Sequence, residues 1–315
     1  MSSRCRPVAY LHTLLRMMVV LVLVSGCRST TVPPPPTSTA AQPTTSWPEK
    51  LNDFRFRWSA EPGFELTSGQ AVPLRAYLES WLVSYYTADP DAGYPGFERS
   101  TPEPVDRTSP EWLETPYAYR EIRGYRGKSN YDIANQRFVG NEDLHVLRVE
   151  PMSSGFRAFV CDATFDVFEQ RDGAPTFTPL TFKSSSDTDE SDFHNMKVWR
   201  IEFSEHDSRV GPTPPAAPTV PQVGPLPAPR DDVFGPWFIT GATNVTFWSD
   251  IDFPELPKGS PESKQRSREA RDAEAAMREQ CLGRYPLNAE QRKTIATTVI
   301  DKPPTVEPAL PGWPE

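Results

Sequence analysis

Apolar and aromatic side chains recur at every third and fourth position between Leu74 and Tyr85, which is the spacing of one face of an α-helix. These positions are Leu74, Tyr77, Leu78, Trp81, Leu82 and Tyr85. The residues Thr67 to Gln70 before them resemble a capping box, and Pro73 suits the first turn of a helix. The Asp89-Pro90 step disfavours helical backbone, so the helix should end near Ala88. The pattern therefore predicts an amphipathic helix with one buried, aromatic-rich face.

Alternation of apolar and polar positions dominates the middle of the chain and predicts an antiparallel sheet. The clearest run is Phe156–Glu169, where one face carries Phe159, Cys161, Ala163, Phe165 and Val167. The opposite face begins apolar and continues as Asp162, Thr164 and Asp166. A period of two indicates that the Cys161 face is buried and that the other face becomes polar part-way along. Shorter runs predict further strands at Leu144–Val149, Thr176–Phe182, Val198–Phe203, Pro236–Ile239 and Asn244–Trp248.

Capping residues mark two further helices. Ser109-Pro110-Glu111 predicts a short helix that stops at Pro116. Further on, Ser260 as N-cap, Pro261 at the first position and Gly283 as C-cap delimit a long charged helix. Its thin apolar edge consists of Ala270, Ala273, Ala276 and Met277. A helix with so little apolar surface needs an attachment to stay on the domain.

Proline is unusually frequent, at 36 of 315 residues. It concentrates in three segments, residues 28–50, Gly211–Pro229 and Pro303–Pro314. Segments of this composition cannot pack a core, and their prolines favour extended backbone. We interpret all three as solvated spacers, and the first as a tether.

The first 26 residues have the features of a secretory signal. Arg4, Arg6 and Arg16 precede or flank the apolar core Met17–Val24, which is too short to span a bilayer. The following Val24-Ser25-Gly26-Cys27 resembles the lipobox of bacterial lipoproteins. This resemblance implies cleavage before Cys27 and a lipid on Cys27. The alternative is an ordinary signal peptide whose small residues happen to precede a cysteine.

The cysteine count predicts one disulfide bond. Of four cysteines, Cys5 would leave with the signal and Cys27 would be acylated, so only Cys161 and Cys281 remain. Export places them in an oxidising compartment, where pairing is the default. Two separate buried thiols are the alternative. We expect no metal site, because the two cysteines lack a CxxC spacing or neighbouring histidines.

Composition and charge exclude several classes of protein. The chain has 33 basic and 42 acidic residues and a net charge of −9, which argues against a nucleic-acid partner. No apolar run reaches 18 residues, so a polytopic membrane protein is excluded. No P-loop, GxSxG or dinucleotide-binding glycine pattern is present, and we expect no cofactor.

Acid–base chemistry requires a titratable group in a water-poor pocket. The candidates are His145 on a predicted strand, and Asp162 and Asp166 on the polar face of the Phe156–Glu169 run. We interpret the two carboxylates as facing solvent on the open side of the sheet, which argues against catalysis. His194 and His206 lie beside polar loops, and no two histidines have the spacing of metal ligands.

The order of a helix followed by a long meander that ends in a Trp-rich strand resembles the NTF2-like (cystatin-like α+β) superfamily. The elements that carry this resemblance lie between about residues 70 and 250: Leu74–Tyr85, Asp89–Gly96, Phe159–Glu169, Val198–Phe203 and Gly235–Ile239. The whole set is also similar to actinobacterial envelope lipoproteins. The superfamily resemblance implies a curved sheet that wraps the helices and leaves a cone-shaped cavity. Some members use the cavity as isomerases, dehydratases or polyketide cyclases, and others only bind or assemble.

These observations predict an α+β protein in which an N-terminal amphipathic helix packs on a curved antiparallel sheet and a C-terminal helical arm follows. The expected parts are a signal peptide at 1–26, a tether at 27–50, an NTF2-like domain at 51–254 with a Pro-rich insertion at 205–233, and a helix and Pro-rich tail at 255–315.

We expect a lipoprotein on the extracytoplasmic face of the bacterial cell membrane, anchored by its N-terminal lipid. The favoured function is non-catalytic binding or scaffolding of an envelope protein or a small apolar ligand. A cavity enzyme of the isomerase or dehydratase type is the alternative, and a structural spacer is a further one.

Overall fold

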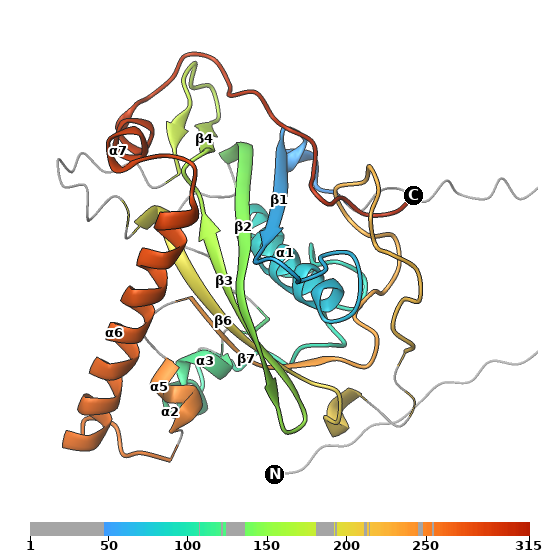
Figure 1. The fold of residues 1–315 in the computed structure, drawn as a ribbon, viewed down its shortest axis with the longest axis vertical. Coiled ribbons are helices and arrows are strands. Elements are labelled where there is room, and N and C mark those ends of the chain that lie inside the picture. Colours follow the sequence, from blue (N-terminus) through green and yellow to red (C-terminus); the bar gives the residue numbers. More distant parts are fainter. Residues whose placement is uncertain are drawn as a thin grey trace, which may run out of the picture. The chain divides into compact units, whose positions relative to one another are not determined.

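The computed structural model describes residues 47–315 except 107, 121, 124–135, 181–191, 193, 211–212, 214, 245–247 and 254. The predicted signal peptide, Cys27 and most of the tether lie outside the described residues. Within the described part, one sheet lies between two helices, α1 (Ala71–Thr87) and α6 (Pro261–Arg284) (Figure 1). The α+β class is therefore confirmed.

Among the described residues, the sheet has seven strands. They are β1 (Phe54–Ala60), β2 (Gln136–Met152), β3 (Gly155–Ala163), β4 (Val167–Arg171), β5 (Thr178–Pro179), β6 (Met196–Ser204) and β7 (Phe238–Thr243). Six of them pair antiparallel in the order β5-β4-β2-β3-β6-β7. The remaining strand, β1, joins β2 in parallel on the opposite edge of β2 from β3 and β4. The predicted antiparallel meander is thus present, with one additional parallel strand.

The shorter helices lie between and after the strands. They are η1 (Glu49–Leu51), α2 (Pro110–Glu114), α3 (Tyr117–Arg120), η3 (Ser208–Val210), α5 (Trp248–Asp252) and α7 (Ala289–Thr297). The Ser109 hydroxyl caps α2 as predicted. Helix α7 was not predicted, although Asn288 and Gln291 form a capping box at its start.

Helix α1 confirms the predicted helix and its end, because Ala88 adopts left-handed backbone with φ of 53° at the C-cap. The predicted capping box is wrong. Gln70 is the N-cap and makes no side-chain cap, while the Thr67 hydroxyl donates to Glu65. Tyr85, predicted on the buried face, is 40% exposed, and Tyr86 is buried instead. Nearly all residues of α1 are buried, so a single apolar face does not describe the helix, and Tyr85 lies on its small exposed part.

Strand β1 was not predicted, and the folded part begins before residue 51. Trp47 stacks on Phe54 and meets Phe56 edge-on, and the Leu51 side chain is fully buried. Phe54, Phe56 and Trp58 alternate with polar residues and face α1. The first residues of the domain therefore lie within the segment expected to be tether.

The predicted strand Phe156–Glu169 is two strands that share one edge of β2. Asp143 lies opposite Ala163, and Gly140 lies opposite Val167, so one extra residue separates β3 from β4. Because an extra residue reverses the alternation, Val167 joins the α1 side of the sheet while Phe165 stays on the Cys161 side.

Two main hydrophobic cores cover the two faces of the sheet, and a minor third cluster consists of Val139, Phe168 and Phe177. The larger lies against α1, and the smaller lies against α6. The predicted disulfide between Cys161 on β3 and Cys281 on α6 is confirmed. Such a bond is typical of chains exported to an oxidising compartment.

The start of α6 also confirms its prediction, because the Ser260 hydroxyl caps the helix before Pro261. The helix ends at Arg284 with Tyr285 as C-cap, so the predicted Gly283 cap is wrong. Ala270 and Met277 pack on the smaller core, whereas Ala273 and Ala276 are exposed. The attachment expected of this polar helix is therefore the disulfide together with a few apolar contacts.

The interpretation of the later Pro-rich segments as spacers is wrong. Trp313 is 1% exposed, and Gln222 and Ala228 are also buried. Leu226 and Trp313 form a β-bridge between the two segments. These segments belong to the domain because a few of their side chains are buried in it and their backbone groups form hydrogen bonds.

Candidate functional site

Two acidic side chains lie next to each other inside the larger core. Glu142 is on β2 and Asp162 is on β3, and neither is exposed to solvent. Asp162 lies opposite Leu144 in the sheet register, so Glu142 and Asp162 point to the same face, toward α1. Their carboxyl groups are within hydrogen-bonding reach of each other. We call these two residues the acid pair.

Each member of the acid pair accepts one hydrogen bond from an aromatic side chain. The Tyr86 hydroxyl donates to Glu142 Oε2 over 2.8 Å, and the Trp199 indole donates to Asp162 Oδ2 over 2.9 Å. The other two oxygens, Glu142 Oε1 and Asp162 Oδ1, receive no hydrogen bond from an N–H or hydroxyl group of the described residues. A proton held between the two carboxyl groups satisfies such a pair.

Burial favours the protonated form of Glu142. Desolvation raises the pKa of Glu142 well above its usual value, and the negative charge of Asp162 raises it further. Burial also raises the pKa of Tyr86, which therefore remains a hydrogen-bond donor. Two like charges side by side in a dry core are unfavourable, so the neighbouring carboxyl group and the burial act in the same direction on the pKa of Glu142.

Aromatic rings separate the acid pair from solvent. Trp199 meets Trp81 edge-on with ring centres 4.8 Å apart, and Trp81 stacks on Tyr85 at 5.7 Å. Tyr85 is 40% exposed and forms the outer end of this series. A group could reach the acid pair by this route only if the rings moved.

The interpretation of Asp162 as a solvent-facing carboxylate is wrong. Alternation correctly placed it on the face opposite Cys161, but helix α1 covers that face completely. The covering helix lies more than seventy residues earlier in the chain, so the local pattern could not reveal it. Both faces of β3 are buried.

The structure does not bring His145 or Asp166 to the acid pair. His145 faces the other side of the sheet, where Nδ1 is 2.8 Å from the Ser59 hydroxyl and Nε2 is 3.2 Å from Glu61. Asp166 lies in the interruption between β3 and β4 and accepts a hydrogen bond from the Tyr285 hydroxyl over 3.1 Å.

A second group of acids surrounds Tyr285 at the end of α6. The Tyr285 hydroxyl also lies 3.4 Å from Asp143, so Asp143 and Asp166 share it. Burial, and then the charge of Asp166, raises the pKa of Asp143 to about 6. Burial also raises the pKa of Asp166. The contact of Tyr285 with Asp143 joins the end of α6 to β2, whereas the disulfide joins α6 to β3.

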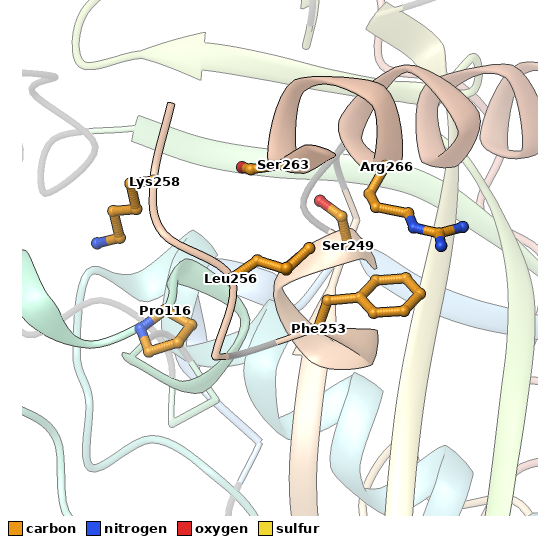
Figure 2. Close-up of a pocket in the computed structure, with 7 residues that line it drawn as sticks. All are labelled: Pro116, Ser249, Phe253, Leu256, Lys258, Ser263 and Arg266. Atoms are coloured by element: carbon orange, nitrogen blue, oxygen red, sulfur yellow. The ribbon is translucent and has the colours of Figure 1, made fainter. Parts of the chain in front are cut away.

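A small cavity lies beside α5 and the start of α6 (Figure 2). Its volume is about 40 Å³, which is room for a water molecule or two. The side chains that line it are Pro116, Ser249, Phe253, Leu256, Lys258, Ser263 and Arg266. The Arg266 guanidinium lies over the Phe253 ring and is paired with Glu262 and Glu269. The cavity shares no residue with the acid pair.

No protein-family model matches the chain, and searches of curated proteins and of solved structures find no match. Among the described residues, no group of three His, Cys, Asp or Glu side chains could hold a metal ion. None of the helices in the described part is both long and apolar enough to cross a membrane.

The acid pair makes the stability of the domain depend on pH. The pKa of Glu142 is higher in the folded state than in the unfolded state. The stabilisation by its protonated form is therefore fully present below about pH 4. It is lost as the pH rises through the raised pKa. We expect Glu142→Gln to flatten this loss, since glutamine can donate to Asp162 as the protonated acid does. The measurement is the free energy of unfolding in denaturant from about pH 4 to pH 9.

Glu290→Gln is the matched control, because Glu290 is exposed on α7. Its profile should run parallel to that of the wild type. If Glu142→Gln also runs parallel to the wild type over the whole range, the acid pair does not hold a proton.

Proposed function

We propose that this protein is a lipid-anchored, extracytoplasmic binding module without catalytic activity. Its domain would be NTF2-like and would be held at the outer face of a bacterial cell membrane through Cys27. The partner would be an envelope protein or a small apolar ligand.

The observation that carries this proposal is that each buried acid of the larger core accepts hydrogen bonds from aromatic side chains of the fold itself. Asp162 is bonded to Trp199 and Glu142 to Tyr86. Glu79 on α1 accepts from the indoles of Trp58 and Trp313 and from the Tyr94 hydroxyl. Large aromatic side chains pack between α1 and the sheet, which supports a structural role for these acids.

The disulfide supports the proposed location, because such bonds persist outside the cytoplasm. The NTF2-like assignment rests on the arrangement of α1 followed by an antiparallel sheet that packs on it. Strand β1, which precedes α1 and joins the sheet in parallel, departs from the expected order.

A cavity enzyme is the second candidate, and the acid pair is the observation that favours it. A protonated carboxyl group in a dry interior is a general acid, and acids with raised pKa values cluster at active sites. Movement of Trp81 and Tyr85 would be needed to admit a substrate. In that case Asp162→Asn would abolish turnover while the protein stays folded.

Capture of the tagged protein from its native membranes tests the favoured function. The wild type should incorporate a fatty-acid probe, fractionate with membranes and retain a partner, because a lipoprotein with two or three acyl chains is stably anchored. Cys27→Ala should lose the label and the membrane association. Cys5→Ala is the matched control, since Cys5 lies inside the predicted signal, and it should label like the wild type. Equal labelling of Cys27→Ala would refute the anchor.

A further inference from the structure

The C-terminal segment lies along the free edge of β1. We call residues 307–313 the strap. After α7 the chain crosses the end of the sheet and runs beside β1 (Figure 1). Leu310 pairs in parallel with Arg57: the Trp58 N–H donates to the Leu310 carbonyl, and the Leu310 N–H donates to the Phe56 carbonyl over 3.3 Å. One β-bridge thus joins the strap to the edge of β1, and pairing of an extended segment with a sheet edge is a common mode of peptide recognition.

Two side chains of the sheet extend this backbone recognition. The Asn141 amide donates to the Glu307 carbonyl over 3.0 Å and accepts from the Glu307 N–H over 2.8 Å. Arg57 Nη1 donates to the Pro308 carbonyl over 2.8 Å. These contacts are made to backbone groups, so they select an extended conformation rather than particular side chains.

Sequence selectivity comes from Trp313. Its side chain is 1% exposed, and its indole N–H donates to Glu79 over 2.8 Å. The Arg75 guanidinium lies 4.1 Å from the centre of the Trp313 ring. Arg75 Nη2 also donates to the carbonyls of Pro311 and Gly312, over 2.8 and 3.1 Å. The site thus binds the carbonyl groups of Pro311 and Gly312 and the indole of Trp313 that follows them.

Groups outside the strap hold this site in place. Glu79 also accepts from Trp58 and Tyr94, and Arg75 Nη1 donates to the carbonyls of Leu66 and Gln222. Both charged side chains are on α1 and are buried. Without the strap, Arg75 would therefore keep two donors, and Glu79 an acceptor, directed at the place where the peptide lies.

The connection that leads into the strap is largely exposed to solvent. Residues 301–303 and 305 are exposed, and the disulfide lies before them at Cys281. A short linker gives the chain's own strap an effective concentration in the millimolar range, so it occupies the groove at rest. Anchored copies confined to a membrane would raise the concentration of the same segment from a neighbour.

We propose that the edge of β1 and the buried Arg75 and Glu79 side chains form a peptide-binding groove for an extended segment with a Pro-Gly-Trp sequence, and that the strap of a second copy can replace the chain's own. This inference rests on the proposed binding role and names its ligand class. The second copy is the occupant because its strap is the sequence whose fit is seen directly in the structure.

A nicked full-length chain tests the groove. A specific protease site is placed between the exposed Asp301 and Lys302, and the disulfide is left intact. After cleavage, a fluorescent peptide of residues 302–315 should exchange into the groove with a stoichiometry of one. The peptide with Trp313→Ala should bind about 30-fold more weakly, because it loses a buried aromatic anchor. The peptide with Thr305→Ala, an exposed position, should bind like the wild-type peptide.

Each outcome decides the proposal. If the nicked protein loses structure when its fragment leaves and the added peptide restores it, the groove is confirmed. If the fragment never exchanges, or if the peptide fails to restore the structure, the strap is an integral strand and the proposal is wrong. If uncut labelled and unlabelled chains are refolded together and form no mixed dimers in native mass spectrometry, the second copy is excluded as occupant. Partner capture by the anchored wild-type protein is measured separately, so its result distinguishes failure of the groove from failure of the proposed function.

Discussion

Loss of the Cys161–Cys281 disulfide is expected to lower the free energy of unfolding by about 4–5 kcal/mol in the chain-entropy model. The bond joins residues separated by 120 positions, and closing so long a loop restricts the unfolded chain strongly. The measurement is denaturant unfolding of the oxidised protein and of the double variant Cys161→Ala/Cys281→Ala.

The reduced wild-type protein is the control for packing. It keeps both sulfur atoms in the smaller core, so any further loss in the double variant measures the missing side-chain contacts. A difference below about 1 kcal/mol between oxidised and reduced protein would contradict the prediction.

Reduction should loosen α6 before the rest of the domain. Helix α6 contributes Cys281, Leu282 and Met277 to the smaller core, and most of its other side chains are exposed or half-buried. The strap should stay in place because its contacts to Arg75 and Glu79 do not involve α6. Hydrogen exchange is therefore expected to rise along Pro261–Arg284 and to stay low at Trp313.

Local patterns predicted those elements whose burial is visible in their own sequence. The stripe from Leu74 onward and the Asp89-Pro90 step predicted α1 and its end, and Ser260 with Pro261 predicted the start of α6. Strand β1 has an equally clear signal, since Phe54, Phe56 and Trp58 alternate with polar residues. Strand β1 was nevertheless not among the predicted elements.

The acid pair could not be predicted in the same way. Alternation with a period of two indicates which residues share a face of a strand, but it does not indicate what covers that face. Asp162 is buried because α1, far away in the chain, packs over it. Glu142 lies in the polar run Asn141-Glu142-Asp143 inside a strand, and such a run between apolar residues is a signal for buried polar contacts.

Composition misled the interpretation of the C-terminal segment for a related reason. A Pro-rich segment has too little apolar surface to form its own core, but it can still bind to an existing one. Trp313 provides one large anchor, and the carbonyls of Pro311 and Gly312 accept hydrogen bonds from Arg75, more than two hundred residues earlier. Only the three-dimensional structure brings these partners together.

Arg75→Met is expected to lower the free energy of unfolding by about 3–5 kcal/mol, which is the usual cost of removing one partner of a buried ion pair. Methionine has a similar length and no charge, so the change removes the hydrogen bonds and keeps much of the volume. Glu79 would remain buried without its cation, and the carbonyls of Leu66, Gln222 and Pro311 would lose their donor. The measurement is denaturant unfolding at neutral pH. Arg268→Met, at an exposed position of α6, is the matched control and should change stability by less than about 0.5 kcal/mol.

The pH dependence of this loss distinguishes an ion pair from simple packing. Burial raises the pKa of Glu79, and the charge of Arg75 opposes that rise. Without Arg75, the pKa of Glu79 should rise further, and a raised folded-state pKa means that stability is lost as the pH increases. The cost of Arg75→Met should therefore be smaller at about pH 5 than at about pH 8, and adding Glu79→Gln should recover part of it at the higher pH. A cost that is equal at both pH values, and that Glu79→Gln leaves unchanged, would mean that Arg75 acts only through its volume and its bonds to the carbonyls.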